Sequence, residues 1–317
     1  MPLKPLPEPD SKPERFLGFV RGSLAFAFLF STLLTINMLQ TVSLVIKPFS
    51  KTAFRKANRW MANLWWTWCA LGAERIYRTE FVMSGDNVPA QENAIVVLNH
   101  QDMADITVML TFARSKMRVG DLKWFAKNAL KYVPGIGWGM LFLDCLFIKR
   151  NWTDDRDYIH RVFEKIVTFR VPLWLMIFPE GTRLSLSKIA RSRQYAGDRG
   201  FTPLQHVLFP RAKGFAAAVQ ELHGHVQAVY DVTIGYVDGV PTLWQWIKGY
   251  VRLVNVHVRR FVIDDLPAES DALTAWLVKL YEEKDALLES YYTKGVFPSG
   301  LPATSETPSA FQTKPRG

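Results

Sequence analysis

Five short apolar runs constrain the fold of this chain most strongly. Each is long enough for one buried strand, and stretches with helical periodicity, such as 153–168 and 271–291, lie between or after them. Strands that alternate with helices are typical of an α/β domain. We predict a mixed, largely parallel sheet covered by helices, preceded by an N-terminal membrane-embedded helical segment. The predicted strands are Ala94–Leu98, Cys145–Ile148, Leu173–Phe178, Ala228–Tyr236 and Val251–Val262.

The helical stretch 271–291 carries one apolar stripe and one charged side. Periodicity near 3.6 residues predicts which side chains face the core of the domain and which face water. We expect Leu273, Leu277, Leu280, Tyr281 and Leu287 to face inward, and Glu282, Glu283 and Lys284 to face outward.

The N-terminal part of the chain carries a run of 25 uncharged residues, from Gly22 to Ile46. About 20 apolar residues suffice to cross a bilayer. The run is longer than the apolar part of a typical signal peptide, and no small-residue cleavage site follows it. Its polar side chains leave two arrangements open, a spanning helix and a bent hairpin that enters one leaflet.

The next segment, Lys51–Leu71, has the pattern of a basic, tryptophan-rich amphipathic helix. Such helices lie at membrane interfaces, and the same pattern also suits a helix that packs on a catalytic core. The net charge of +10 fits nucleic acid, an anionic membrane or an anionic substrate. The neighbouring apolar run favours the membrane, and no recognised motif indicates nucleic-acid binding.

The two cysteines, Cys69 and Cys145, show neither a disulfide framework nor metal-ligand spacing. We interpret both as packing residues, in a reducing compartment. We predict no metal site, because His223 and His225 lack an acidic or cysteine partner at ligand spacing. The expected organisation is a flexible tail (1–15), membrane-embedded and interfacial helices (16–71), a catalytic domain (72–299) and a second flexible tail (300–317).

Polar clusters follow three of the apolar runs. They are Asn99–Asp105, Phe147–Arg150 and Phe178–Arg183. Because sites in α/β proteins form at strand ends, the three clusters predict one convergent site. His100 and Asp105 pair only if His100 precedes a helix and Asp105 lies in its first turn, since residues five apart on one helix point about 140° apart. Asp105 then fixes the imidazole tautomer, and the other nitrogen takes a proton from a hydroxyl. The plainer alternative is a helix-capping aspartate beside a core histidine.

These blocks resemble those of the glycerolipid acyltransferase superfamily, which carries N-H-x4-D, an F-I-x-R-like block and F-P-E-G-T-R in this order. Leu208–Phe215 and Ala228–Thr233 are similar to the branch with eukaryotic-type 1-acylglycerol-3-phosphate and lysophospholipid acyltransferases. The resemblance covers roughly residues 16–267. It implies that His100 and Asp105 are catalytic, and that acyl-coenzyme A or acyl carrier protein is the co-substrate, without a further cofactor. The absence of a G-x-S-x-G nucleophile agrees with direct attack on the thioester.

Two arginines beside a hydroxyl-activating histidine suggest an acceptor that carries a hydroxyl and a phosphate. Glu180 either orients an arginine or binds the acceptor. The predicted substrate-binding residues are Arg150, Glu180, Gly181, Thr182 and Arg183, with Lys149, Arg211 and Lys213 as weaker candidates. A further basic cluster is either a solvated loop or a site for lipid headgroups or the phosphates of an acyl carrier. It comprises Arg183, Lys188, Arg191, Arg193 and Arg199.

The sequence therefore predicts a membrane-bound acyltransferase that acylates the sn-2 hydroxyl of 1-acylglycerol 3-phosphate to give phosphatidic acid. Its expected partners are the lysophospholipid acceptor, the acyl donor and membrane lipids. Remodelling of another lysophospholipid and a non-catalytic basic membrane-binding module are the alternatives. We expect it at a bacterial cytoplasmic membrane, with the catalytic domain facing the cytoplasm.

Overall fold

The computed structural model describes residues 4–149 and 151–298, and these form one seven-stranded sheet in the order β1-β7-β6-β2-β5-β3-β4. All neighbouring strands are parallel except β6 and β7, which are antiparallel, so the predicted mixed, largely parallel sheet is confirmed. The strands are β1 (Glu80–Gly85), β2 (Ala94–Leu98), β3 (Leu122–Lys127), β4 (Leu146–Ile148), β5 (Trp174–Ile177), β6 (Ala228–Gly235) and β7 (Leu253–Val262).

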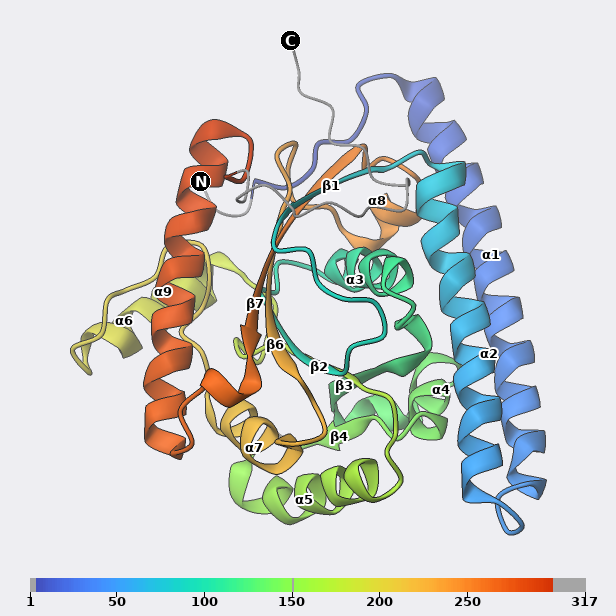
Figure 1. Ribbon diagram of the computed structural model, residues 1–317. Coiled ribbons are helices and arrows are strands. Elements are labelled where there is room, and N and C mark those ends of the chain that lie inside the picture. The colour runs from blue at the N-terminus through green and yellow to red at the C-terminus, as the bar shows by residue number, and fades with distance from the viewer. Residues whose placement is uncertain (1–3, 150, 299–317) are drawn as a thin grey trace.

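Helices cover both faces of the sheet (Figure 1). The α-helices are α1 (Lys12–Val42), α2 (Lys51–Leu71), α3 (Ala104–Ser115), α4 (Ile136–Phe142), α5 (Trp152–Thr168), α6 (Leu186–Gly197), α7 (Lys213–Leu222), α8 (Leu243–Ile247) and α9 (Ser270–Lys294). Within the described part of the chain, five short helical turns also form, namely η1 (Ser43–Val45), η2 (Gly72–Ile76), η3 (Val119–Asp121), η4 (Asn128–Tyr132) and η5 (Ile263–Asp265).

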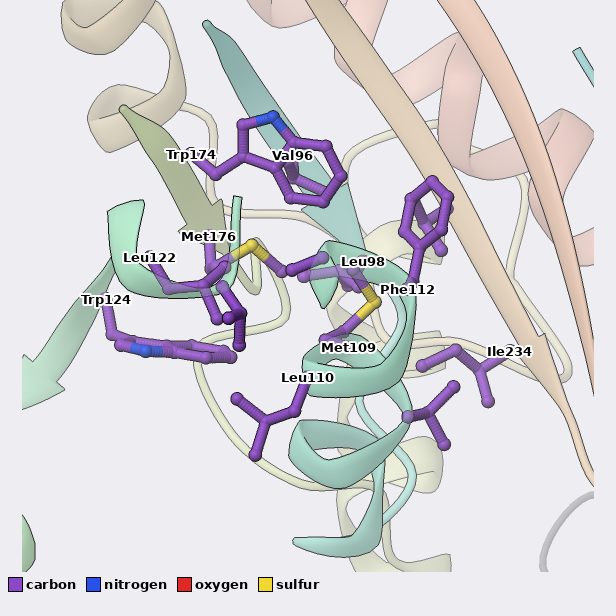
Figure 2. Packing of buried hydrophobic residues seen from close by; sticks show 14 of the residues in the cluster. Val96, Leu98, Met109, Leu110, Phe112, Leu122, Trp124, Trp174, Met176 and Ile234 are labelled. Carbon is purple, nitrogen blue, oxygen red and sulfur yellow. The ribbon is translucent and has the colours of Figure 1, made fainter. Parts of the chain in front are cut away.

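Strand β2 lies at the centre of the sheet and is buried on both faces. Val96 and Leu98 pack toward α3, whereas Ile95 and Val97 belong to the core under α5, α7 and α9. Figure 2 shows side chains of α3, including Met109 and Phe112, packed over the central strands. This rigid centre holds the loop after β2, which carries the first polar cluster.

Strands β1 and β3 were not among the predicted strands, because β1 contains only three consecutive apolar residues and Lys123 interrupts the apolar pattern of β3. In β3, Lys123 is buried, and its Nζ donates to the carbonyl oxygen of Leu143 at 2.5 Å. The two cysteines pack as predicted, and burial raises the pKa of Cys69 to about 12 and that of Cys145 to about 11.

The prediction that Lys284 faces solvent is wrong. Its side chain on α9 is fully buried, and Nζ lies 2.6 Å from Oδ1 of Asp231 on β6. Nζ also donates to the carbonyl oxygen of Val232 at 2.8 Å and to Oγ1 of Thr233 at 3.0 Å. Helical periodicity alone cannot reveal a buried ion pair whose carboxylate comes from a distant strand.

Helices α1 and α2 lie side by side along one side of the domain (Figure 1). The bounds of α2 match the predicted amphipathic helix, and α1 is long and apolar enough to cross a membrane. The expected tail 1–15 differs from the structure, since α1 begins at Lys12 and the backbone N–H of Leu6 donates to the carbonyl oxygen of Val240 at 3.0 Å. The expected tail 300–317 lies outside the described residues.

Candidate active site

His100 and Asp105 meet at the end of β2. His100 lies in the loop that follows the strand, and Asp105 lies in the first turn of α3, which is the arrangement that their spacing requires. Nδ1 of His100 lies 3.0 Å from Oδ2 of Asp105. Because the carboxylate accepts at Nδ1–H, it holds the ring in the tautomer that leaves Nε2 unprotonated.

Four donors hold the buried carboxylate of Asp105. Its Oδ2 accepts from His100 and from the backbone N–H groups of Gln101 at 2.7 Å and Asp102 at 3.0 Å. Its Oδ1 accepts from Oη of Tyr236 at 2.8 Å. Tyr236 was not among the predicted site residues, although it follows β6. The rule that sites form at strand ends, applied to the fourth apolar run, would have found it.

The His100 ring stacks on Phe178, with centroids 4.1 Å apart and an interplanar angle of 27°. Phe178 in turn lies beside Trp124 of β3. No hydrogen bond to Nε2 of His100 is formed within residues 4–149 and 151–298. His100 lines a large cavity, so an acceptor hydroxyl can reach the imidazole.

Glu180 joins three sequence blocks through backbone hydrogen bonds. Its Oε1 accepts from the N–H of His100 at 2.8 Å, and its Oε2 accepts from the N–H of Leu208 at 3.1 Å. Burial raises the pKa of Glu180 to about 8, although the two hydrogen bonds oppose this effect. Both oxygens contact the backbone and neither contacts Arg183, so the geometry favours positioning of His100 over the expected contact with the acceptor.

Arg183 and Arg211 line the same cavity as His100. Nη1 of Arg183 lies 3.9 Å from Oδ2 of Asp102, and its side chain is 52% exposed. The backbone N–H of Arg211 donates to the carbonyl oxygen of Pro179 at 2.8 Å, which fixes this segment beside residues 178–183. Gly181 has a φ of +68°, and a Cβ there would contact the side chain of Arg211. The two arginines therefore form one cationic wall of the cavity.

Of the remaining predicted substrate-binding residues, two line the cavity, one lies outside its wall and one lies outside the described residues. Thr182 and Lys213 line the cavity, and Oγ1 of Thr182 accepts from Nζ of Lys188 at 2.7 Å. Lys149 is exposed, with Nζ 3.9 Å from Oδ2 of Asp154, and is not part of the described cavity wall. Arg150 lies outside the described residues.

Helix α9 supports the loop from behind. Oη of Tyr281 donates to the carbonyl oxygen of Leu98 at 2.8 Å, and Oη of Tyr292 donates to Oε1 of Gln101 at 3.0 Å. Nε2 of Gln101 donates to the carbonyl oxygen of Ile234 at 2.7 Å. No local pattern in the sequence signals these contacts, because each joins the loop to an element more than 100 residues away.

The cavity has a volume of about 2080 Å³ and is lined by both apolar and basic side chains. Leu33, Trp65 and other apolar side chains of α1, α2 and α4 line it, and so do Arg183, Arg211 and the basic residues of α6. His100 lies in its wall together with Trp124 and Phe178. Across the described ranges, no three His, Cys, Asp or Glu side chains gather as a metal site would require.

Comparison with known proteins shows which family the chain is similar to. A family model described as "Acyltransferase" matches residues 80–237, and one described as "Acyltransferase C-terminus" matches residues 246–316. The chain is 36% identical over 280 residues to 1-acyl-sn-glycerol-3-phosphate acyltransferase gamma from Mus musculus, which covers 87% of this chain and 74% of that protein. It is 31% identical over 296 residues to probable 1-acyl-sn-glycerol-3-phosphate acyltransferase 5 from Arabidopsis thaliana, covering 92% and 78%.

The fold has a counterpart among solved structures. The crystal structure of the 1-acyl-sn-glycerophosphate (LPA) acyltransferase PlsC from Thermotoga maritima aligns with a TM-score of 0.51 and 18% identity, over 89% of this chain and 98% of that one. At this identity the likeness concerns the fold. The sequence identity to the relatives above, which spans most of each chain, shows that this protein belongs to the 1-acyl-sn-glycerol-3-phosphate acyltransferase family.

Proposed function

We propose that this protein transfers a fatty acyl group from a thioester donor, acyl-coenzyme A or acyl carrier protein, to the sn-2 hydroxyl of 1-acylglycerol 3-phosphate. The observation that carries the proposal is the His100–Asp105 pair in the wall of a cavity that apolar side chains of α1, α2 and α4 line together with Arg183 and Arg211. A lysophosphatidic acid has matching chemistry, with an acyl chain, a free hydroxyl and a phosphate. The names of the mouse and Arabidopsis relatives point to the same acceptor.

The geometry supports a direct transfer. Nε2 of His100 takes the proton of the acceptor hydroxyl, and the oxygen attacks the thioester carbonyl. Asp105 stabilises the imidazolium that forms. When the tetrahedral intermediate collapses, the C–S bond breaks and the imidazolium returns the proton to the leaving thiolate. The products are phosphatidic acid and the free thiol of the donor.

The cationic wall suits the phosphate of the acceptor. A guanidinium can bind phosphate through two parallel hydrogen bonds and keeps its charge at neutral pH. Arg183 lies beside the loop that carries His100, because the backbone N–H of Leu184 donates to the carbonyl oxygen of His100 at 2.9 Å. Arg211 lies beside the segment of Arg183, because its backbone N–H donates to the carbonyl oxygen of Pro179 at 2.8 Å. A phosphate on this wall would place the sn-2 hydroxyl near the imidazole.

Helix α1 supports attachment to one leaflet of a membrane. Near its N-terminus, Gly18 lies against Tyr250, and Nε of Arg21 donates to the carbonyl oxygen of Lys248 at 2.7 Å. Further along, Leu33 lies against Gly135 of the catalytic domain. A helix that crossed the bilayer between these contacts would draw the domain into the hydrocarbon. We therefore propose that α1 lies along a cytoplasm-facing membrane surface and buries its exposed apolar side in one leaflet.

The test is an assay of the purified full-length protein in mixed micelles, with a panel of lysophospholipids and both donor types. We expect the highest kcat/KM with 1-acylglycerol 3-phosphate. His100→Ala should lower kcat by roughly 100- to 10,000-fold. His160→Ala is the matched control, because His160 is exposed on α5 and pairs with Glu221 away from the cavity. If the turnover of His100→Ala were close to that of His160→Ala, the mechanism would be wrong. If the protein preferred a lysophospholipid with another headgroup, that lipid would be the acceptor.

A further inference from the structure

The roles proposed for His100, Asp105 and the cationic wall leave a basic and aromatic surface at α6 without an assigned function. The segment 186–199 contains four basic residues and one acidic residue, and it forms a helix where a solvated loop was one expectation. Lys188, Arg191 and Tyr195 of α6 line the same cavity as His100, together with Phe201 and Phe209. We call these five residues, Lys188, Arg191, Tyr195, Phe201 and Phe209, the α6 surface.

The aromatic rings of the α6 surface lie close together, and two of them, Tyr195 and Phe201, are exposed. Phe209 lies 4.9 Å from Phe201 and 5.7 Å from Tyr195, measured between ring centroids. Tyr195 is 46% exposed and Phe201 is 41% exposed, so the cluster is not simply core packing. The N–H of Phe209 donates to Oγ of Ser192 at 2.7 Å, which fixes this segment against α6. The guanidinium of Arg199 lies over Tyr195, 3.9 Å from the ring centroid, so a planar ring can stack on Tyr195 if it displaces this exposed side chain, without a change in the backbone.

The cationic groups lie on the cavity side of the same helix. Nζ of Lys188 donates to Oγ1 of Thr182 at 2.7 Å and to the carbonyl oxygen of Arg183 at 2.8 Å. Nε of Arg191 donates to the carbonyl oxygen of Ser187 at 3.3 Å. Neither Lys188 nor Arg191 forms an ion pair within residues 4–149 and 151–298. Both remain available to a phosphate, and Lys188 connects the surface to the wall beside His100.

The place of α6 separates it from the membrane side of the domain. Figure 1 shows α6 and the α1–α2 pair at opposite sides of the domain, with the sheet between them. A lipid acceptor would reach the cavity from the side of α1 and α2, whereas a water-soluble donor can approach α6 from solution. The shared cavity connects the two sides to His100.

We propose that the α6 surface binds the adenine nucleotide of acyl-coenzyme A. The purine would stack on Tyr195 in place of the Arg199 guanidinium, with the tilted rings of Phe201 and Phe209 beside it, and Lys188 and Arg191 would bind the phosphates of the nucleotide. This inference rests on the proposed function, because it names the donor of that reaction. An acyl carrier protein would present acidic helices, for which accessible stacked rings have no use. The exposed rings therefore favour the nucleotide.

A binding experiment tests the proposal without turnover. Adenosine 3′,5′-bisphosphate, the nucleotide half of coenzyme A, is titrated into the full-length protein in micelles and followed by calorimetry. We expect saturable binding that Tyr195→Ala weakens roughly 5- to 150-fold, as the loss of one stacked ring predicts. Tyr195→Phe should restore most of the affinity. Arg191→Ala should weaken binding roughly 10-fold or more. Arg156→Ala is the control, because Arg156 is exposed on α5 outside the cavity wall.

Kinetics then distinguish the possible donors. In Arg191→Ala and Tyr195→Ala, the kcat/KM for acyl-coenzyme A should fall relative to that for an acyl N-acetylcysteamine thioester, which lacks the nucleotide. Absence of nucleotide binding to the wild type, or binding that neither variant weakens, overturns the proposal. A fall in kcat/KM that both variants show only with acyl carrier protein as the donor also overturns it. A protein that binds the nucleotide through these residues but acylates no lysolipid would instead contradict the proposed function.

Discussion

Oη of Tyr236 donates a hydrogen bond of 2.8 Å to Oδ1 of Asp105, the carboxylate oxygen that His100 does not contact. Both partners are buried, and burial raises the pKa of Tyr236 well above its ordinary value, so the phenol remains a donor throughout the physiological range. The carboxylate is therefore fixed from two sides, by the loop through Oδ2 and by β6 through Oδ1. The orientation of the His100 ring depends on this second support.

Tyr236→Phe should lower kcat roughly 10-fold, because the carboxylate loses the donor that fixes its plane. It should also lower the free energy of unfolding by about 1–3 kcal/mol, since Oδ1 of Asp105 is left buried without a donor. Tyr230→Phe is a matched control, because it removes a phenol–carboxylate bond to Glu92 at the other end of β6. Its kcat should stay near that of the wild type. An equal loss of kcat in both variants would mean that Tyr236 acts only through stability.

Glu180 makes the stability of the protein depend on pH. Burial raises its pKa from an ordinary value of 4.5 to about 8, so between these pH values the folded state holds a proton that the unfolded state has lost. The contribution of Glu180 is thus most favourable below pH 4.5 and falls as the pH rises toward 8. The total loss is on the order of 5 kcal/mol. Thermal unfolding of the wild type and of Glu180→Gln, measured from about pH 5 to about pH 8, checks this.

The other titrating groups contribute equally to both proteins, so the difference between the two melting curves isolates Glu180. We expect the melting temperature of the wild type to decline relative to that of Glu180→Gln as the pH rises. Parallel pH profiles would show that a nearby cation or water keeps the carboxylate ionised in the folded protein.

Much of the fold follows from local pattern. The bounds of β2 and α2 match the prediction, because β2 is a continuous apolar run and α2 repeats its apolar residues at helical spacing. The pairing of His100 with Asp105 also follows from spacing, because only one placement relative to a helix lets the two side chains meet. These are features that a few neighbouring residues determine.

The rest depends on contacts between distant segments. Lys284 looks like a solvent-facing lysine in its own helix, and only Asp231 on β6 makes its burial possible. Glu180 looks like a partner of Arg183 or of a substrate, and only the fold brings the N–H groups of His100 and Leu208 to its two oxygens. Tyr236 contacts Asp105 across 131 positions of the sequence. A single sequence carries no local signal for such pairs.

The buried pair of Lys284 and Asp231 should be costly to break. Lys284→Met removes the cation and leaves Asp231 with Arg259, whose Nη2 lies 2.7 Å from Oδ2. Loss of one partner of a buried pair costs about 3–5 kcal/mol, and Arg259 should keep the cost near the lower value. Denaturant unfolding measures it. Glu283→Ala is the control, because Glu283 is 45% exposed and should change stability by less than about 1 kcal/mol. Equal effects would contradict the assignment of a buried pair.

Arg183→Ala should mainly raise the KM for lysophosphatidic acid. The loss of a charge-assisted hydrogen bond is worth about 1.5–3 kcal/mol, so the KM should rise roughly 10- to 150-fold. Exposure of half of the side chain places the expected value near the lower end of that range. Arg183→Lys should restore part of the affinity, because lysine keeps the charge without the two-pronged geometry. A rise in the KM for the donor instead would assign Arg183 to the donor site.

The outer side of α1 should bind lipid. Leu24 is 68% exposed and Met38 is 62% exposed, and their spacing places them on nearly the same side of the helix. A lysine within the hydrocarbon costs about 2.5–3.5 kcal/mol, so Leu24→Lys or Met38→Lys should weaken vesicle binding roughly 100-fold. Leu186→Lys makes the same change at a residue of α6 that is 73% exposed on the far side of the domain. Equal effects of all three substitutions on vesicle binding would show that the outer side of α1 does not contact the membrane.

Insertion into one leaflet also predicts that both ends of α1 lie on the same side of the membrane. Lys12 begins the helix, and Phe49, which is 87% exposed, follows it in the turn before α2. Lys12→Cys and Phe49→Cys are introduced one at a time into a protein whose Cys69 and Cys145 are replaced by serine, and each is bound to sealed vesicles from outside. A membrane-impermeant maleimide should label both positions, because the contacts of Gly18 with Tyr250 and of Leu33 with Gly135 hold α1 along the domain. Labelling of only one end would show that α1 crosses the bilayer.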